Sequence, residues 1–338
     1  MGLLIMSKLP LVSVIIPTYN RAHVIGKTID DVFGQTYKKI ELIVVDDGST
    51  DNTADILSVY GDKIVVVRQN NSGPAAARNR GAAACHGDII AFQDSDDFWD
   101  PTKLERQVRI LDRAGPSVPC CLANMLLRDL HGDGRDHYSF AVSLVRPRYQ
   151  EGIWLNVAEV LATRFIMFNQ AAAIRRSAFE RLGGFDESIK YLEDYDLPMR
   201  LAFEGPWAYV RDPLATWAGG GPDSFARSAK ANGASLLDCF IRILERALVM
   251  AEQRGDSRVA RQLNRRLTSS RRELETFNAG KSKSYPAQLG QQLTGYLRKY
   301  RAGLARRTPW YPKMKTVTID AYCDGAHGHT PLFRGQEE

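Results

Sequence analysis

Short apolar runs rich in β-branched residues recur along the first hundred residues of the chain. They occupy Val12–Pro17, Glu41–Val45, Ile64–Val67 and Ile89–Gln93, and polar residues bound each of them. Short runs of this kind are typical of buried strands. We therefore predict four strands in this part of the chain.

Helical patterns separate these runs. Val24–Phe33 has apolar residues at helical spacing, and Asp51–Val59 begins with helix-capping residues. Gly73 and Pro74 open an alanine-rich helix, since proline is common at the first helical position, and a further helix is expected over Thr102–Arg113. Strands that alternate with helices in this way predict an α/β fold, with a parallel sheet built through right-handed crossovers.

Beyond residue 115 the pattern is less regular. A strand is expected over Cys120–Leu126, a turn-rich loop or hairpin over His131–Arg135, and a second strand over Phe165–Ile174. Arg176–Phe185 has the pattern of a short helix ended by glycine. Leu192–Leu201 has that of a helix that begins with acidic residues.

The alternation ends near residue 234. Long amphipathic helical patterns then run to about Arg307, with one apolar stripe: Leu236, Leu237, Phe240, Leu244 and Leu248. The segment from Gly280 to Pro286 interrupts the pattern, and the tail from Thr308 is expected to be irregular.

Composition and charge narrow the class of protein. A chain of 338 residues, 44% hydrophobic and 25% charged, is ordinary for a soluble protein of about two domains. No apolar run approaches the roughly 20 residues of a membrane span, and residues 1–6 lack the features of a signal peptide. The five cysteines form no CxxC pair, so neither a disulfide framework nor a zinc site is indicated, and a cytoplasmic location is expected.

The net charge of +6 is unevenly distributed. The segment from Arg242 to Lys315 holds eighteen Lys and Arg and five Asp and Glu, a charge of +13. This bias suggests an anionic partner for the C-terminal helices; a solvated basic helical face is the alternative.

Three carboxylates, Asp94, Asp96 and Asp97, follow the predicted strand at Ile89–Gln93. Like charges at this spacing repel unless a cation lies among them. Mg²⁺ and Mn²⁺ prefer oxygen ligands and often take one or two carboxylates together with substrate phosphate. The cluster is therefore a candidate metal–diphosphate site. The alternative is a solvated turn, with Asp96 or Asp97 capping the helix after Pro101.

Polar residues also follow the other predicted strands. In open α/β sheets ligands bind beyond the carboxyl ends of the strands, and three clusters fall at such ends: Thr18, Tyr19 and Arg21; Asp46 and Asp47; and Asp94 and Asp96. We expect these clusters to meet at one edge of the sheet.

Three residues of this part of the chain have chemistry suited to a nucleotide. Asp46 and Asp47 could accept hydrogen bonds from a ribose hydroxyl or a pyrimidine N–H, although Asp-Gly-Ser also favours a simple turn. Arg78 lies in the first turns of a helix whose N-terminus suits phosphate. A surface arginine is the alternative.

Five segments together resemble family 2 glycosyltransferases of the GT-A fold. They appear in the family's order and at its spacing: Val12–Asn20, Val45–Asp51, Gly73–Asn79, Asp94–Asp97 and Glu193–Asp196. Each is weakly specific alone, and the set is very specific. The resemblance covers about residues 10 to 225. It implies a mixed sheet flanked by helices, followed here by a C-terminal helical region.

The resemblance implies roles for individual residues. On the donor side, the nucleotide pocket would be lined by Pro17, Thr18, Tyr19 and Arg21. Asp47 would bind the base, Asp46 the ribose, and Arg78 the base or the diphosphate. The DxD motif would be Asp94, Ser95 and Asp96, with Asp96 as the direct metal ligand and Asp94 as its partner. Asp194 would be the general base, and Gly183–Asp186 would shape the acceptor pocket. For Glu193 and Asp196, simple complementation of the helix dipole is the alternative.

The implied reaction moves a sugar from a nucleotide diphosphate to a hydroxyl acceptor with inversion, aided by Mn²⁺ or Mg²⁺. The leaving group needs its charge neutralised, and the attacking hydroxyl needs a base. A UDP-sugar is the favoured donor, with GDP and dTDP open. The acceptor would be a glycan or lipid-linked glycan in surface polysaccharide synthesis. The alternative to an enzyme is a binding protein: a catalytically inactive member of the family that holds nucleotide sugar or glycan.

One departure from the family concerns the metal. Many GT-A enzymes add a ligand, often His, after the acceptor region, but no histidine lies between His137 and His327. The ion would then be held mainly by Asp96 and the diphosphate, unless His327 or His329 folds back to it.

We predict a glycosyltransferase domain over residues 1–230, with a nucleotide-binding half at about 10–115 and an acceptor half at about 116–230. Residues 231–338 form a basic helical region with an irregular tail. Residues 234–315 are expected to contact anionic lipid at the inner face of the membrane. No nucleic acid is expected, because recognisable binding motifs and interleaved aromatics are lacking. The oligomeric state is not indicated by the sequence.

Overall fold

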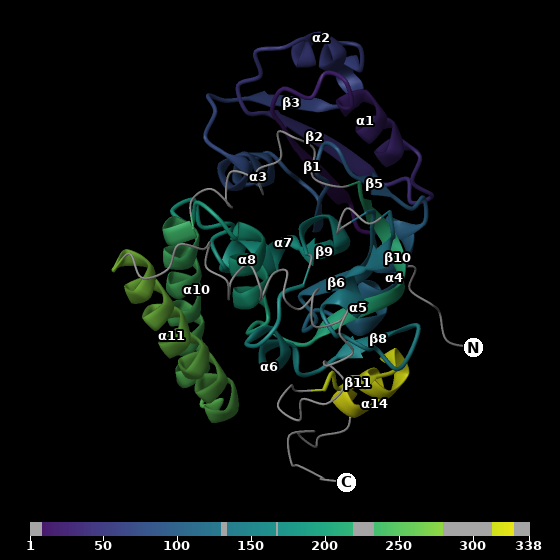
Figure 1. Ribbon diagram of the computed structural model, residues 1–338. Helices are drawn as coiled ribbons and strands as arrows, with labels where there is room; N and C mark the ends of the chain where they lie inside the picture. The colour runs from purple at the N-terminus through teal and green to yellow at the C-terminus, as the bar shows by residue number, and fades with distance from the viewer. Residues whose placement is uncertain (1–8, 130–133, 167, 219–232, 280–312, 328–338) are drawn as a thin grey trace, which may run out of the picture.

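A computed structural model describes residues 9–129, 134–166, 168–218, 233–279 and 313–327 of the chain. Its centre is one mixed sheet with strand order β11-β8-β10-β6-β9-β4-β1-β2-β3, to which β5 and β7 add at β10 and β6. Helices flank the sheet, and two long helices lie to one side of it (Figure 1).

The first half of the chain forms the parallel part of the sheet. Its elements are β1 (Val12–Thr18), α1 (Ile25–Phe33), β2 (Ile40–Asp46), α2 (Thr53–Ser58), a 3₁₀ turn (Gly61–Lys63), β3 (Val65–Arg68), α3 (Pro74–Ala83), β4 (Ile89–Phe92), β5 (Phe98–Trp99) and α4 (Lys103–Ala114). β1 lies between β2 and β4 and is parallel to both. The four predicted strands and their crossover helices are therefore confirmed.

The second half continues the sheet with antiparallel pairs. Its elements are β6 (Cys120–Leu127), β7 (His137–Tyr138), α5 (Ser139–Val142), β8 (Glu151–Trp154), α6 (Val157–Leu161), a 3₁₀ turn (Asn169–Ala171), β9 (Ala172–Arg175), α7 (Arg176–Arg181), α8 (Glu193–Leu201) and β10 (Trp207–Trp217). β9 pairs antiparallel with both β4 and β6, and so joins the two halves into one sheet. The predicted mixed α/β fold is confirmed.

One predicted strand was too long. Of Phe165–Ile174, only the last three residues belong to a strand, and Asn169–Ala171 forms a 3₁₀ turn. The segment is apolar because it is buried: the Phe168 ring packs 5.1 Å from the Trp207 ring. An apolar run reports burial, and burial does not require pairing in a sheet.

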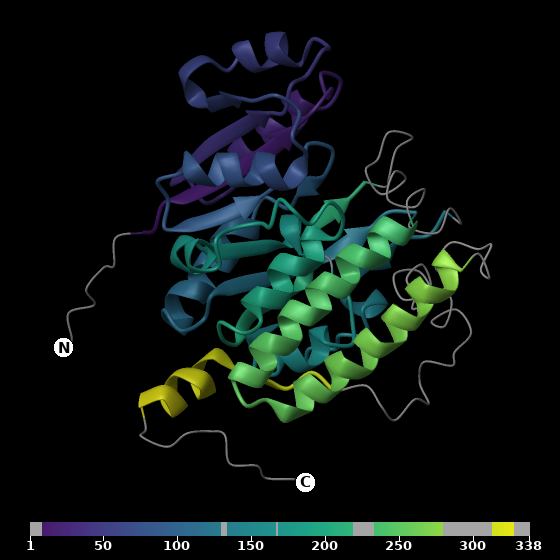
Figure 2. The same cartoon turned by 90° about the vertical axis from the view of Figure 1, so that its left-hand side faces the viewer.

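The C-terminal region begins with a pair of long helices. They are α10 (Gly233–Gln253) and α11 (Ser257–Asn278), and they lie side by side in Figure 2. Leu236, Leu237, Phe240 and Leu244 are buried and Leu248 is partly buried, which confirms the predicted apolar stripe. No helix among the described residues is both long and apolar enough to cross a membrane.

The tail is more ordered than the sequence predicted. β11 (Thr316–Val317) pairs with β8, and α14 (Ile319–His327) packs on α4. Arg113 at the end of α4 forms an ion pair with Asp320, and the Ser117 and Tyr322 hydroxyls lie 3.0 Å apart. These contacts depend on chain segments about 200 residues apart, which local pattern does not reveal.

Candidate active site

The carboxyl ends of β1, β2 and β4 meet at one edge of the sheet, as predicted. Thr18 pairs with Asp46 in the β1–β2 register, and the Asp47 N–H donates to the Thr18 carbonyl over 2.9 Å. On the other side of β1, the Gln93 N–H donates to the Ile15 carbonyl over 3.0 Å. The three polar clusters therefore lie along a single rim.

Asp46 and Asp47 shape the loops of this rim. Asp46 Oδ1 accepts from the Ser49 N–H over 2.9 Å. Asp47 accepts from the Gln69 side chain and from the Ser72 and Gly73 N–H groups over 2.8–2.9 Å. Because a carboxylate offers about four lone-pair positions, Asp47 keeps about one for a ligand. The turn chemistry is thus present whether or not these residues bind a nucleotide.

The end of β1 presents two different surfaces. The Thr18 hydroxyl is buried and has no hydrogen-bond partner among the described residues, while the neighbouring Tyr19 is 43% exposed. A buried hydroxyl without a partner costs free energy, so a bound ligand group would relieve it. Pro17 lies opposite Val45 in the strand pairing, directly before this end.

The acidic loop after β4 has two partly exposed carboxylates, Asp94 and Asp96, and one buried carboxylate, Asp97. Asp94 forms an ion pair with Arg78, and Asp96, whose side chain is 47% exposed, lies 3.6 Å from the Arg21 guanidinium. Between them, the Ser95 carbonyl accepts from the Thr28 hydroxyl over 2.7 Å, which ties the loop to α1. Burial and the charge of Asp94 raise the pKa of Asp96.

Asp97 belongs to the structural part of this loop. Its side chain is buried and accepts from the Gln170 side chain and from the Ala218 N–H. Burial and the charge of Asp94 raise the pKa of Asp97 well above its ordinary value. The helix-cap alternative is wrong for both Asp96 and Asp97, because α4 begins at Lys103 with Thr102 at its cap position.

Arg78 connects the acidic loop to α8. One guanidinium nitrogen lies 2.7 Å from Asp94 Oδ1 and another lies 3.0 Å from Glu193 Oε1. The arginine side chain is only 6% exposed, so it is a buried cation shared by two carboxylates rather than a surface residue. Charge-assisted bonds of this geometry are strong and directional. The acidic loop and the start of α8 therefore face each other across one side chain.

Asp194 lies beside this bridge, in the first turn of α8. Its neighbours Glu193 and Asp196 are paired with Arg78 and Arg200, whereas Asp194 has no ion pair among the described residues. Burial, assisted by Glu193 and Asp94 and opposed by Arg78, raises the pKa of Asp194 to about 7. A carboxyl with a pKa near neutrality is suited to proton transfer. Glu193 and Asp196 have specific partners, so neither is only a dipole complement.

The carboxylates fit an ion that takes most of its ligands from substrate. Within the described chain, no group of three or more His, Cys, Asp or Glu side chains is arranged to hold a metal. Asp94 and Asp96 offer carboxylate oxygens on one short loop, and Mg²⁺ or Mn²⁺ bound to one or two carboxylates plus phosphate needs no more.

The hypothesis that a histidine of the tail reaches the metal falls largely outside the described residues. His329 and the side chain of His327 are not described. The contacts of α14 with Arg113 and Ser117 hold it at the C-terminal end of α4, and the acidic loop precedes the other end.

Comparison with known proteins identifies the family. The model of glycosyl transferase family 2 matches residues 13–183, about half of the chain. The chain belongs to this family. This family 2 glycosyltransferase is 35% identical over 193 residues to an uncharacterized glycosyltransferase of Rickettsia typhi, covering 56% of the chain and 57% of the relative. The transferase thus spans just over half the length of such curated relatives.

Two further similarities concern proteins with a named substrate or a bound ligand. Over 104 residues the transferase is 42% identical to the UDP-Glc:α-D-GlcNAc-diphosphoundecaprenol β-1,3-glucosyltransferase WfaP of Escherichia coli, covering 30% of the chain and 41% of WfaP. Its fold is similar to that of S. aureus TarS 1-349, solved in complex with UDP-GlcNAc, with a TM-score of 0.60, 19% identity and coverage of 92% and 83% of the two chains. At that identity the structural similarity shows the fold alone.

Proposed function

We propose that this enzyme transfers a sugar from a UDP-sugar to a hydroxyl of a glycan or lipid-linked glycan, with inversion and with Mn²⁺ or Mg²⁺ at Asp94 and Asp96. The observation that carries the proposal is the Arg78 bridge, which joins Asp94 to Glu193 and so brings the donor-side acids next to Asp194. Groups for leaving-group stabilisation and for proton removal thereby share one site.

The rim residues supply the donor pocket. We assign Thr18 and Asp47 to the base, Asp46 to the ribose, and Pro17, Tyr19 and Arg21 to the pocket wall, with Arg78, Asp94 and Ser95 at the diphosphate. The unpartnered Thr18 hydroxyl and the spare acceptor position on Asp47 support this assignment. The UDP-Glc donor in the name of WfaP and the UDP-GlcNAc bound to TarS favour UDP. The fold is also similar, with a TM-score of 0.52, to that of a mannosyltransferase of Pyrobaculum calidifontis solved with GDP-Man and Mn²⁺. This similarity is consistent with a bound metal and leaves GDP as the alternative nucleotide.

The reaction follows from the placement of the acids. A divalent ion at Asp94 and Asp96 would neutralise charge on the departing diphosphate. Asp194 accepts the proton of the acceptor hydroxyl while the oxygen of that hydroxyl bonds to the anomeric carbon. The bond from that carbon to the diphosphate oxygen breaks, and UDP leaves with the electron pair. A single displacement from the opposite face inverts the anomeric centre.

The first prediction concerns Asp96. We expect Asp96→Ala to abolish the metal-dependent thermal stabilisation by the donor, because the Asp96 carboxylate, which is 47% exposed, is the proposed metal ligand of the acidic loop. The measurement is a thermal shift with UDP-glucose, UDP-N-acetylglucosamine and GDP-mannose, each with and without MnCl₂. Asp62→Ala, which removes an exposed acid outside the site, is the matched control. A normal Mn²⁺-dependent shift in Asp96→Ala would remove Asp96 from the metal site.

The basic face of α11 supports an anionic partner. Arg261, Arg265 and Arg272 are exposed on this helix. A lipid-linked acceptor, like the diphosphoundecaprenol-linked one in the name of WfaP, would place the enzyme at the cytoplasmic face of a membrane. Each basic residue near an anionic surface contributes about 1 kcal/mol. We expect replacement of all three by Gln to weaken binding to phosphatidylglycerol vesicles by about 100-fold in a sedimentation assay. Equal binding by the variant would show that α11 is a solvated face.

A further inference from the structure

The C-terminal helices contact the helix that carries Asp194. Helix α10 packs against α8, and α11 packs against α10 and α6. Figure 1 shows this pair on the side of the sheet where α8 lies. The family model ends at residue 183, before α8 and both of these helices. Their effect on the reaction is therefore a separate question from membership of the family.

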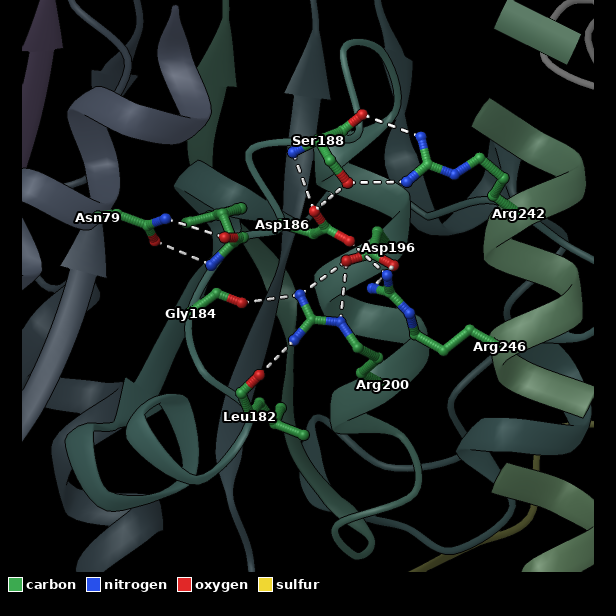
Figure 3. Close-up of polar contacts among 10 residues, drawn as sticks. Asn79, Leu182, Gly184, Asp186, Ser188, Asp196, Arg200, Arg242 and Arg246 are labelled. Atoms are coloured by element: carbon green, nitrogen blue, oxygen red, sulfur yellow. Dashed lines mark hydrogen bonds and ion pairs between the residues drawn. The ribbon is translucent and has the colours of Figure 1, made fainter. Parts of the chain in front are cut away.

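Arg246 of α10 reaches two acids of the acceptor side. It lies 3.0 Å from Asp196 Oδ1 and also forms an ion pair with Asp186 (Figure 3). The Asp196 side chain is 2% exposed and that of Arg246 is 36% exposed. Although burial acts to raise it, the Ser188 hydrogen bonds and the Arg246 guanidinium hold the pKa of Asp186 at about 2. The contact therefore involves an ionised pair at ordinary pH.

The same network holds the loop of residues 182–185, which contains Gly183 and Gly184 and lies before α8. Arg200 bonds Asp196 over 2.7 Å and donates to the carbonyls of Leu182 and Gly184 over 2.8 and 2.7 Å. On the other side of this loop, Asn79 exchanges two hydrogen bonds of 2.9 Å with the Phe185 backbone. Figure 3 shows the side chains from α3, α8 and α10 converging on this loop. Its position is thus set from both the donor side and the C-terminal helices.

Helix α11 holds the residue next to Asp194. Arg266 donates to the Tyr195 hydroxyl over 2.6 Å and to the Ala162 carbonyl over 3.1 Å. Its guanidinium lies 4.7 Å from the centre of the Phe240 ring, which stacks on the Tyr195 ring at 5.7 Å. The two residues that follow Asp194 are therefore each held by an arginine from a different C-terminal helix.

Helix α8 needs such support. It has nine residues, begins after Leu192 in a left-handed conformation and contains Pro198. Helices this short are marginal alone, so tertiary contacts set their position. A general base works only within hydrogen-bond reach of its proton, and a misplacement of about 1 Å can cost about 100-fold in rate.

We propose that Arg246 is a positioning residue for Asp194, and that α10 is thereby part of the catalytic unit. The inference rests on the proposed function of Asp194 as the base. Because Asp196 keeps Arg200 when Arg246 is removed, this buried carboxylate stays paired, while α8 loses its ion pair to α10 and keeps the ring contact between Tyr195 and Phe240.

The test compares Arg246→Ala and Arg246→Lys with Arg271→Ala. Arg271 pairs with Glu245 over 2.7 Å, which joins α11 to α10 without touching α8. UDP release is measured with UDP-glucose or UDP-N-acetylglucosamine and MnCl₂. For Arg246→Ala we expect a fall in kcat of about 100-fold, with KM for the donor within about twofold. The lysine variant should recover part of kcat, because it keeps the charge, and Arg271→Ala should resemble wild type.

A second readout needs no donor. We expect backbone amide exchange in residues 192–199 to be faster in Arg246→Ala than in wild type, and unchanged in Arg271→Ala. Wild-type kcat and exchange in Arg246→Ala, or equal losses in Arg271→Ala, would overturn the inference. Asp194→Asn in the same assay separates the two proposals. If Asp194→Asn is inactive while Arg246→Ala is normal, only the positioning role fails, whereas an active Asp194→Asn removes the base itself.

Discussion

Asp194→Asn is expected to lower the rate of sugar transfer by about 10³-fold while donor binding stays near the wild-type value. The amide keeps the size of the side chain but cannot accept the acceptor's proton, and general base catalysis contributes about 10²–10⁴ in rate. Asp94 and Asp96 are unchanged, so the proposed metal–diphosphate contacts are retained. Transfer rates are measured by UDP release and donor affinity by calorimetry in the presence of MnCl₂.

The pH profile of the wild-type enzyme supplies the matching test. Asp194 must be ionised to act as a base, and its pKa is raised to about 7. Activity should therefore rise with pH and level off above neutrality, with roughly a tenth of the plateau one unit below the pKa. A cation held at Asp94 would move this midpoint to lower pH. Full activity in Asp194→Asn, or an acid limb that survives in it, would assign the base to another residue.

Arg78→Ala is expected to destabilise the fold as well as to inactivate the enzyme. The side chains of Asp94 and Glu193 are 30% and 10% exposed, and both would lose their cation. Removing one partner of a buried ion pair costs about 3–5 kcal/mol. The partly exposed Asp94 favours the lower end. We expect a loss of about 3 kcal/mol in the free energy of unfolding, measured by urea denaturation.

Two variants control this experiment. Arg80→Ala removes an exposed arginine two residues along the same helix and should change stability by less than about 0.5 kcal/mol. Arg78→Lys keeps the charge but lacks the planar fork that reaches two carboxylates, so it should recover part of the stability and little activity. An Arg78→Ala protein as stable as Arg80→Ala would show that the bridge contributes nothing to folding.

The donor half of the fold could be predicted from the sequence because its signals are local. The β-branched runs at Val12–Pro17 and Ile89–Gln93 and the Gly73–Pro74 helix start each depend on a few adjacent residues. Once the strands are parallel, topology alone requires their carboxyl ends to meet. The common rim of Thr18, Asp46 and Asp94 followed from this.

The pairings within the site could not be predicted in the same way. Arg78 and Glu193 are 115 residues apart, and Arg246 and Asp196 are 50 apart. The spacing of charged residues along a sequence does not indicate which residues they pair with. Whether Arg78 is a surface arginine or a buried bridge could therefore be decided only from the three-dimensional fold. The same holds for α14, whose contacts with α4 bring together residues about 200 positions apart.

The most direct test of the account is a crystal structure of the enzyme with UDP and Mn²⁺. We predict an anomalous manganese peak at Asp96 that also contacts the diphosphate, with the Asp194 carboxylate open to the space beside the bound nucleotide. A diphosphate bound away from the Asp94–Asp97 loop, or an Asp194 carboxylate walled off from the nucleotide by protein, would contradict it.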